Sequence, residues 1–366
     1  MKPLLLHVYS TFAVGGPQVR FAAIANHFGD RWRHAIVAMD GNLACRERLD
    51  PGLDVSFPEI DIRKGDTLGN IRRFRHVLAD MRPHCLVTSN WGAIEWALAN
   101  AIRPLVRHVH IEDGFGPEER RAQLPRRVLT RRLALRSCIT VVPSRTLLAI
   151  ATDIWRLNPA RLRYVPNGID PARFDAPRFD AHRLAHDLPV IGTVAALRPE
   201  KNLQRLLRAF AQASQEQPCR LMIVGDGPER PALETLAAEL CIADRVTFTG
   251  HLPDPAAAYL GFDIFALSSD TEQMPISVLE AMAAGLPVAS TDVGDVAGMV
   301  SAENTPFVRG HDDAALANGI ADLLRDPATR DTTGRANRAY LMQHFTAATM
   351  LHHYAGLFDS RPDRKG

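Results

Sequence analysis

The chain has 366 residues, more than the size at which a single hydrophobic core usually keeps growing, so two domains are expected. Apolar residues make up 46% of the sequence and charged residues 23%, as in an ordinary soluble globular protein. The formal net charge is +2, and no stretch has the roughly 18 apolar residues of a membrane-spanning helix. We therefore expect neither a nucleic-acid-binding protein nor an integral membrane protein.

The cysteines and the N-terminus indicate the compartment. The five cysteines are scattered and include no C-x-x-C pair, which favours reduced thiols over a disulfide framework or a zinc site. The opening MKPLLLHVYS is typical of a short buried strand, because it lacks the long apolar region and cleavage site of a signal peptide. We expect a cytoplasmic protein, either free or peripheral at the inner face of the membrane.

The first half of the chain alternates short apolar runs with helix-like patterns. Runs typical of buried strands occupy residues 4–10, 34–40, 85–89, 106–112 and 138–144. Amphipathic stretches lie between them, at residues 18–28, 68–81 and 95–102. This alternation predicts a parallel sheet covered by helices on both faces.

The alternation stops in a stretch rich in proline and aspartate and then begins again. We interpret residues 169–188 as an interdomain linker. Apolar runs return at residues 190–197, 220–227, 245–250, 264–269 and 286–291. The predicted fold class is therefore α/β, with Rossmann-like parallel-sheet domains at residues 1–168 and 189–345 that face a cleft. Residues 346–366 form a last helical segment that could cross back to the first domain.

Residues that directly follow strands are the best candidates for function, because open parallel sheets bind ligands beyond the carboxyl ends of their strands. Gly15 and Gly16 follow the first strand, where exposed backbone N–H groups would favour an anion; a plain strand–helix turn is the alternative. Gly225 and Gly227 follow a strand of the second half. They either leave the backbone open to a nucleotide or serve the geometry of a tight turn.

Two cations follow the first strand of the second half. Arg198 and Lys201 stand three residues apart in RPEKN, and Lys201 is the only lysine between Lys64 and Lys365. An arginine fork and a lysine point charge at a strand end could hold a diphosphate. The alternative is a solvated charged turn in which Glu200 is the partner.

The segment TEQMPISVLEAMAAGLPV, residues 271–288, contains two glutamates. Glu272 is expected in a loop, and Pro275 suits the first turn of a helix over residues 276–284 that Gly285 ends. Glu280 is then on the second turn of that helix. The two carboxylates could reach opposite ends of one ligand lying across the helix N-terminus, where free N–H groups would meet anionic oxygen. Two solvated glutamates are the alternative.

The strand HVHIE ends in a group of polar residues. We expect His110 to face the cleft and His108 to point to the opposite face, with Glu112, Asp113 and Gly114 at the carboxyl end. A structural histidine is the alternative. No third histidine or cysteine lies nearby, so the pattern does not favour a metal site.

A stretch after Glu119 is rich in arginine and has no acid. Its seven arginines are Arg120, Arg121, Arg126, Arg127, Arg131, Arg132 and Arg136. Leucines and a valine between them form an apolar stripe of imperfect helical spacing. This composition suits a surface helix that meets anionic lipid or a phosphorylated acceptor, or else an ordinary outer helix.

Together these stretches resemble the family 4 glycosyltransferases of the GT-B fold. The likeness runs from GGPQ at residue 15 to the last helical segment, and its most specific element is the E-x7-E pattern from Glu272 to Glu280. The segments VPNGID, RPEKN and VGDGP appear in the expected order. HIEDGFG and the arginine-rich stretch are similar to a subgroup associated with bacterial polysaccharide assembly.

The resemblance implies transfer of a sugar from a nucleotide diphosphate donor, UDP or GDP, to a hydroxyl of a glycan or lipid-linked acceptor, with retention. The first domain would bind the acceptor and the second the donor. Glu280 would bind the ribose, Glu272 would contact the donor sugar, and Arg198 with Lys201 would neutralise the diphosphate. Gly16 would let the first-domain loop approach the same phosphates. The reacting sugar and acceptor would lie near His110, with Asp113 also on the acceptor side.

The full set of donor-binding residues that the resemblance implies is Gly15, Gly16, Arg198, Lys201, Gly225, Gly227, Glu272, Gln273, Met274, Pro275, Ile276 and Glu280. The residues implied in catalysis are His110, Glu272, Arg198 and Lys201. Gln273 replaces the glycine that many relatives have there, so the pocket for the donor sugar is expected to differ from theirs. No D-x-D motif occurs in the second half, in keeping with the metal independence that the fold implies.

Other classes remain as alternatives. A nucleotide-sugar epimerase of similar architecture would form product without an acceptor. A non-catalytic sugar-binding protein would normally be exported, and a nicotinamide oxidoreductase would need the GxGxxG fingerprint that the first loop lacks. The sequence identifies neither the base, the sugar, the acceptor nor the oligomeric state.

Overall fold

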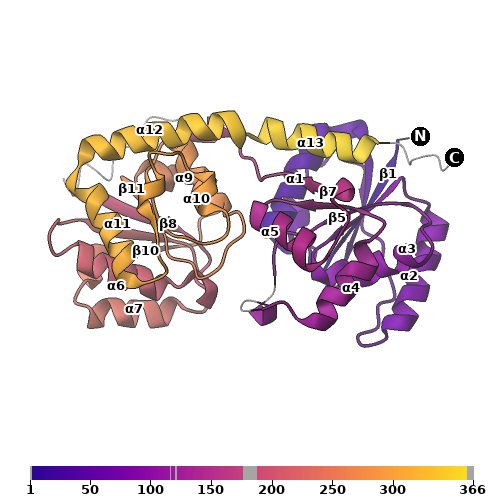
Figure 1. The fold of residues 1–366 in the computed structure, drawn as a ribbon. Helices are drawn as coiled ribbons and strands as arrows, with labels where there is room; N and C mark the ends of the chain where they lie inside the picture. The colour runs from indigo at the N-terminus through magenta and orange to yellow at the C-terminus, as the bar shows by residue number, and fades with distance from the viewer. Residues whose placement is uncertain (1, 116, 120–121, 176–187, 361–366) are drawn as a thin grey trace. The chain divides into compact units, whose positions relative to one another are not determined.

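The computed structural model describes residues 2–115, 117–119, 122–175 and 188–360. The chain divides into two compact units (Figure 1). Unit 1 is formed by Met1–Pro166 together with Leu351–Gly366, and unit 2 by Asn167–Met350. The boundary therefore falls two residues before the predicted end of the first domain.

Unit 1 contains a seven-stranded sheet in the order β3-β2-β1-β4-β5-β6-β7, and every neighbouring pair is parallel. Its strands are β1 (Leu4–Tyr9), β2 (Arg33–Ala38), β3 (Val55–Ser56), β4 (Cys85–Ser89), β5 (Arg107–Ile111), β6 (Ile139–Val142) and β7 (Leu162–Tyr164). Its α-helices are α1 (Gly16–Phe28), α2 (Thr67–Met81), α3 (Ile94–Ile102), α4 (Pro125–Leu135), α5 (Arg145–Ala149) and most of α13 (Ala347–Asp359). The five strands predicted for the first half are all confirmed.

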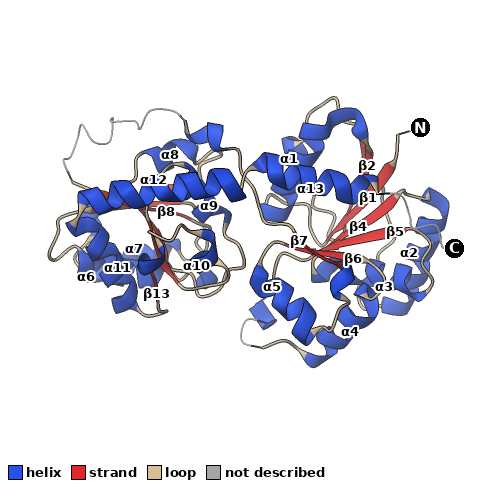
Figure 2. Ribbon diagram, turned by 45° about the horizontal axis from the view of Figure 1, so that its top comes forward, coloured by secondary structure: helices blue, strands red, loops and turns tan. Residues whose placement is uncertain are grey.

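Unit 2 contains a six-stranded sheet in the order β10-β9-β8-β11-β12-β13, again parallel throughout. Its strands are β8 (Val190–Val194), β9 (Arg220–Val224), β10 (Val246–Gly250), β11 (Ile264–Leu267), β12 (Val288–Thr291) and β13 (Val308–Arg309). Its α-helices are α6 (Leu203–Ala213), α7 (Arg230–Glu239), α8 (Ala256–Leu260), α9 (Ile276–Ala283), α10 (Val296–Met299), α11 (Asp313–Arg325) and α12 (Pro327–His344). Helices cover both faces of each sheet (Figure 2). The predicted α/β class with two Rossmann-like domains is confirmed.

Helix α6 shows how the sequence pattern builds these layers. Leu203, Leu206, Leu207 and Phe210 recur at helical spacing, and all four are buried against the sheet and helix α11. Asn202 caps the helix by accepting the backbone N–H of Arg205. This cap fixes the start of α6 directly after the turn that contains Lys201.

The segment predicted as a linker is partly built into unit 2. Ile169 forms a backbone bridge with Thr346, and the Phe174 ring lies edge-on to Tyr259 at 5.8 Å. Residues 169–175 therefore pack in unit 2, because their apolar side chains find partners there. Residues 176–187 of the predicted linker lie outside the described residues.

The last helical segment supplies contacts to unit 1. Phe358 on α13 packs edge-on against His7 of β1, and Trp32 donates from its indole N–H to Asp359 at 3.0 Å. Arg107 donates to the Leu357 carbonyl. The final turns of α13 are thus part of the core of unit 1, although the chain reaches them only after completing unit 2.

Candidate functional site

The densest cluster of predicted site residues lies in unit 2, where β8 and β11 end. Lys201, in the 3-10 turn η8 (Pro199–Lys201), places its Nζ 2.5 Å from Oε1 of Glu272. The two side chains are 25% and 12% exposed. The Ser269 hydroxyl donates to the same Glu272 oxygen at 2.8 Å. A cation and a hydroxyl therefore hold Glu272, and the alternative of a solvated glutamate is wrong.

Backbone contacts fix the loops that present this pair. The Asp270 N–H donates to the Glu200 carbonyl at 2.9 Å, and the Ser268 hydroxyl donates to the Lys201 carbonyl at 2.9 Å. Arg205 donates from Nη1 to the Ser268 carbonyl and to Oδ1 of Asp270, both at 2.8 Å. The loop after β8 is therefore tied to the loop after β11, which holds the Lys201 ammonium beside the Glu272 carboxylate.

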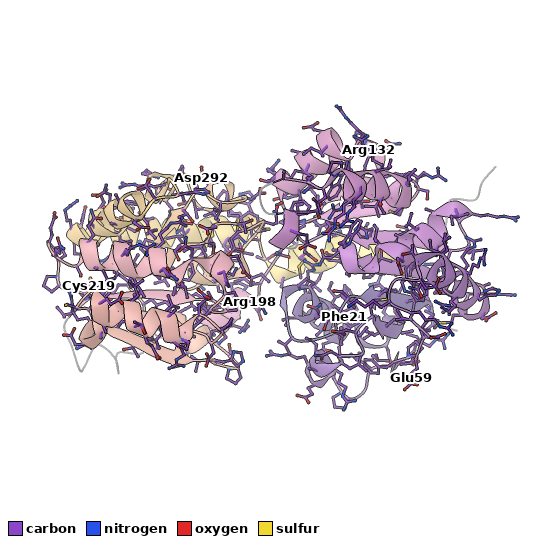
Figure 3. The ribbon with its side chains drawn as sticks, turned by 90° about the horizontal axis from the view of Figure 1, so that it is seen from below. Phe21, Glu59, Arg132, Arg198, Cys219 and Asp292 are labelled. Atoms are coloured by element: carbon purple, nitrogen blue, oxygen red, sulfur yellow. The ribbon has the colours of Figure 1, made fainter. Side chains whose placement is uncertain are left out.

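Arg198, the other predicted cation, directly precedes η8 and is exposed (Figure 3). Its guanidinium makes no ion pair with the described residues, whereas Lys201 is paired with Glu272. The two cations lie on one short turn, so both are available to one anionic ligand at this edge of the sheet. An arginine without a carboxylate partner binds such an anion without first breaking an internal ion pair.

Gly294 presses on the loop that contains Glu272. Its φ is +55°, and a Cβ at this position would lie 2.5 Å from the Glu272 carbonyl oxygen and 2.6 Å from that of Gln273. The next residue, Asp295, donates its N–H to the Gln273 carbonyl at 2.9 Å. The carbonyls of this loop therefore face the turn after β12, and only glycine fits at that contact.

The start of helix α9 is fixed from a second direction. Asn167 donates from its side-chain amide to the Met274 carbonyl at 3.2 Å. Pro275 precedes the first helical residue, Ile276, and no side chain caps this N-terminus among the described residues. Gly285 follows the helix with φ +70° and ends it, as the sequence predicts.

Glu280, on the second turn of α9, is also held by another side chain. The Tyr259 hydroxyl, from helix α8, donates to Oε2 of Glu280 at 2.8 Å. Burial raises the pKa of the Glu280 carboxyl, while the hydrogen bond from Tyr259 and the charge of Arg173 lower it. A partly buried carboxylate with one fixed donor is a suitable acceptor for the hydroxyl groups of a ligand.

Gly225 and Gly227 are required by the packing of the chain itself. A Cβ on Gly225, whose φ is +135°, would lie 1.9 Å from the carbonyl oxygen of Ala195. A Cβ on Gly227 would lie 2.5 Å from the carbonyl oxygen of Leu197. The tight-turn interpretation therefore accounts for both glycines, and a direct contact with a nucleotide stays a prediction.

In unit 1, Gly15 and Gly16 stand at the N-terminus of α1. Gly15 is in extended conformation, and a Cβ there would lie 2.9 Å from the Gln18 side-chain oxygen. Gly16 is the first helical residue and is exposed. The first turn of α1 has no acidic side chain, so its N–H groups are compatible with the predicted anion contact.

Asp113, predicted on the acceptor side, is bound by Arg20 of helix α1. The guanidinium donates from Nη1 and Nη2 to the two carboxylate oxygens at 2.6 and 2.8 Å. Burial alone would lower the pKa of Arg20, but the Asp113 carboxylate raises it overall. Both oxygens of Asp113 are therefore occupied by Arg20, which the sequence analysis did not single out.

His110 is fully buried rather than facing an open surface. Its Nδ1 lies 2.8 Å from Oγ1 of Thr88, and its Nε2 lies 3.4 Å from Oε2 of Glu112. His108 contacts the same Thr88 hydroxyl at 2.7 Å. The prediction that His108 and His110 point to opposite faces is therefore wrong, because residues two apart on a strand lie on the same face. Contact of His110 with a reacting sugar stays a prediction.

The arginine-rich helix α4 uses its arginines in two ways. Arg131 is fully buried and donates to both carboxylate oxygens of Glu119 at 3.0 Å, and Arg127 pairs with Glu118 and Glu119. The exposed residues of the helix and its end include Arg126, Leu129, Arg132, Leu133 and Arg136. Arg120 and Arg121 lie outside the described residues.

Two family models match the chain in succession. The model described as Glycosyltransferase Family 4 matches residues 14–173, and the model described as Glycosyl transferases group 1 matches residues 176–340. Between them they account for the chain except for residues 1–13, 174–175 and 341–366. The chain belongs to the family 4 glycosyltransferases.

Curated members of family 4 are similar to this chain over part of their length. The 2-deoxystreptamine glucosyltransferase of Streptomyces kanamyceticus is 32% identical over 250 residues, 65% of this chain and 63% of that protein. The GDP-mannose-dependent alpha-(1-6)-phosphatidylinositol monomannoside mannosyltransferase of Mycolicibacterium smegmatis is 30% identical over 223 residues, 56% of this chain and 58% of that protein. The matches thus span less than two thirds of these relatives.

Solved structures are similar to this chain over nearly its whole length. HepE of Anabaena, in complex with UDP-glucose, has a TM-score of 0.80 to this structure at 19% identity, and the match covers 97% of this chain and 99% of that one. Such a likeness establishes the fold, which is the GT-B fold of two Rossmann-like units.

Two further findings concern a membrane and a metal ion as partners of this chain. Within the described ranges, no helix is long and apolar enough to cross a bilayer. No group of three or more His, Cys, Asp or Glu side chains among the described residues is arranged to hold a metal ion.

Proposed function

We propose that this chain transfers a sugar from a nucleotide diphosphate sugar to a hydroxyl of a glycan or lipid-linked acceptor, with retention and without a metal ion. The main support is the arrangement in unit 2, where Arg198, Lys201, Glu272 and Glu280 all lie at the carboxyl edge of one parallel sheet. In this proposal, unit 1 binds the acceptor and unit 2 the donor.

Each of these side chains suits one part of the donor. The Glu280 carboxylate accepts from the ribose hydroxyls, Arg198 and Lys201 neutralise the diphosphate, and Glu272 faces the sugar. Positive charge at the departing diphosphate favours cleavage of the glycosidic bond, since negative charge grows there in the transition state. The two cations supply this charge, which is the physical reason for a metal-independent reaction.

A double-displacement mechanism would need a carboxylate nucleophile at the anomeric carbon. Lys201 and Ser269 both bind Oε1 of Glu272, and these contacts stabilise the carboxylate and weaken it as a nucleophile. We therefore propose a front-face reaction in which the leaving phosphate assists the incoming hydroxyl. Retention follows from attack on the face that the phosphate leaves.

The donor is proposed to be a UDP- or GDP-sugar. HepE is described in complex with UDP-glucose, and the mycobacterial relative is named as GDP-mannose-dependent. Gln273, whose carbonyl is fixed by Asp295, is the residue of the sugar loop that we expect to select the sugar.

A panel of UDP-, GDP- and ADP-sugars tests the proposed function. We expect slow hydrolysis of one UDP- or GDP-sugar without acceptor, faster release of the nucleotide with a suitable acceptor, and unchanged rates in EDTA. Nuclear magnetic resonance of the early product should show the donor's anomeric configuration. A product formed only by epimerisation of the donor would contradict the proposal, as would binding of sugars without turnover of any donor.

We also propose that the exposed face of helix α4 docks on an anionic membrane surface at the inner face of the membrane. Five of the eight exposed large apolar side chains among the described residues lie on α4, at the end of α3 or on the segments after α3 and α5: Ile102, Leu105, Leu129, Leu133 and Ile154. Arg132 donates to the Ile154 carbonyl and Arg136 to the Ala101 carbonyl, which ties α4 to both neighbouring segments. Arg132 projects from the surface of unit 1 (Figure 3).

The membrane proposal makes a quantitative prediction. Changing Arg126, Arg132 and Arg136 together to glutamine should weaken co-sedimentation with phosphatidylglycerol vesicles about a hundredfold, since each basic residue near such a surface contributes about 1 kcal/mol. Arg46, Arg48 and Arg63, exposed elsewhere on unit 1, serve as a matched control when changed to glutamine. Sedimentation that persists equally in both triple variants would remove α4 as the docking face.

A further inference from the structure

Tyr259 is a buried polar side chain that the predicted mechanism does not use. It is fully buried on the short helix α8, surrounded by the rings of Phe174, Phe262 and Phe265 at centroid distances of 5.7–5.8 Å. Its hydroxyl has a polar partner in this otherwise apolar environment, because it donates to Oε2 of Glu280 at 2.8 Å. The aromatic packing thus fixes the ring, and the ring fixes one oxygen of the carboxylate.

We propose that Tyr259 is a positioning residue for nucleotide binding, which orients the Glu280 carboxylate toward the ribose hydroxyls. This inference rests on the proposed function, in which Glu280 accepts from the ribose. Tyr259 itself touches no substrate in this proposal. Its hydroxyl occupies one carboxylate oxygen and restricts the side chain to an orientation in which the other oxygen can meet the ligand.

The charges around Glu280 explain why this hydrogen bond matters. Burial raises the pKa of Glu280, the Tyr259 hydroxyl and Arg173 lower it, and Asp254 raises it. Arg173 and Asp254 pair with each other at 2.6 Å near the surface, where solvent screens them and their effects on Glu280 oppose one another. The Tyr259 hydroxyl is therefore the main contact that offsets the effect of burial on the pKa of Glu280.

Tyr259 remains a donor throughout the accessible pH range. Burial and the neighbouring Glu280 carboxylate raise the pKa of its phenol well above the ordinary value. The proton therefore stays on the tyrosine oxygen, and the carboxylate stays the acceptor. A change from tyrosine to phenylalanine removes this one donor and leaves the ring and its aromatic neighbours in place.

The test is calorimetric titration of UDP and GDP into Tyr259→Phe between pH 5 and pH 9. Loss of a hydrogen bond to a charged group predicts about ten- to hundredfold weaker nucleotide binding near neutral pH. The removed contact lowers the pKa of Glu280, so the variant's Glu280 titrates at higher pH. The loss of affinity on acidification should therefore begin at a higher pH than in the wild type. KM for the donor should rise while kcat at saturating donor stays unchanged.

Matched variants separate positioning from general stability. Tyr354→Phe removes a hydroxyl from another fully buried tyrosine, in unit 1, and should leave nucleotide affinity unchanged. Adding Tyr259→Phe to Glu280→Gln should weaken binding much less than Tyr259→Phe does alone, because the two residues act as one unit.

Four outcomes would overturn the inference. Unchanged affinity and an unshifted pH profile in Tyr259→Phe would leave Tyr259 as a packing residue only, and so would full additivity with Glu280→Gln. Unchanged affinity in Glu280→Gln would remove the ribose role of Glu280, and with it this inference, while sugar transfer by the wild type stands. Absence of both nucleotide binding and donor turnover in the wild type would refute the proposed function as well.

Discussion

Replacement of Lys201 by alanine should lower kcat about 10²- to 10³-fold, which is the usual effect of removing one group that stabilises transition-state charge. The Ser268 hydroxyl donates to the backbone carbonyl of Lys201 and so fixes the position of this residue after β8. We expect the Kd for UDP or GDP to change much less than kcat. The negative charge on the diphosphate increases as the glycosidic bond breaks, so the cation matters most at that moment.

A comparison of variants makes this test specific. Lys64→Ala removes an exposed lysine of unit 1 and should leave kcat unchanged. Lys201→Arg keeps the positive charge but replaces a compact ammonium with a planar fork, so partial activity is expected. If Lys201→Ala weakened ground-state nucleotide binding and left kcat intact, Lys201 would serve in substrate binding alone. Circular dichroism before assay confirms that the loss of the Glu272 partner has not unfolded unit 2.

The sequence predicts the sheets well and their edges poorly. Strands such as β8 and β11 are continuous apolar runs buried on both faces, and that pattern is visible without a structure. The strands it missed, β3, β7 and β13, have two or three residues each and add to the edges of a sheet. Such short segments have no periodicity of their own, because their pairing depends on neighbours distant in sequence.

For the candidate site, the sequence predicts residues whose chemistry is visible in their type and spacing. Lys201 and Glu272, 71 positions apart, are both predicted as site residues because each follows a strand, but their ion pair is seen only in the structure. Ser269 and Tyr259 could not be predicted in this way, because a serine after a strand and a tyrosine in AAAYL are ordinary in any core. Gly294 lets the Glu272 loop pack closely against the turn after β12 because it has no Cβ, and no pattern in the sequence indicates this contact.

Unit 1 shows the limit of reasoning from single strands. His110 and Asp113 stand at a strand end, as functional residues often do, yet one is buried and the other is bound by Arg20. The residues directly after β5 are contacted by side chains from two helices. Arg20 of α1 binds Asp113, and Arg131 of α4 lies beside Glu112. Arg131 is the clearest case, because the sequence groups it with surface arginines and the structure places it in the interior.

Replacement of Arg131 by methionine should destabilise unit 1 by about 3–5 kcal/mol, the usual cost of removing one partner of a buried ion pair. Arg131 donates to both oxygens of Glu119, and its Nε lies 3.5 Å from Oε2 of Glu112. Both carboxylates are also buried, at 3% and 0% exposure. Methionine fills much of the same space, so the loss reports on uncompensated charge rather than on a cavity.

The cation also packs among aromatic rings. The Arg131 guanidinium lies 4.8 Å from the Trp155 ring centroid, 5.0 Å from that of Trp91 and 5.3 Å from that of Phe115. Part of the expected loss is therefore the attraction between a desolvated cation and these rings. All four tryptophans of the chain, Trp32, Trp91, Trp96 and Trp155, belong to unit 1. Their fluorescence during urea unfolding consequently reports on unit 1 alone.

The stability lost in Arg131→Met should depend on pH in a direction that the pKa of Glu119 predicts. Burial alone would raise the pKa of Glu119, but Arg131 and Arg127 lower it overall. A carboxyl with a lowered pKa stabilises the fold above its unfolded pKa, and this contribution is lost as the pH falls through the folded pKa. Without Arg131 the pKa of Glu119 should rise, so that acidification neutralises the buried charge in the variant. Arg131→Met should therefore differ from the wild type less at pH 5 than at pH 8.

Two further variants distinguish a buried ion pair from a surface arginine. Arg126→Met removes an exposed arginine of the same helix and should change stability by no more than about 0.5 kcal/mol. Glu119→Gln in the Arg131→Met background should recover part of the lost stability, because it removes one of the buried charges left without a partner. A loss in Arg131→Met as small as that in Arg126→Met, unaffected by pH, would show that this ion pair does not stabilise unit 1. A large loss together with unchanged vesicle binding would establish that Arg131 acts in the interior and that membrane contact depends on its exposed neighbours.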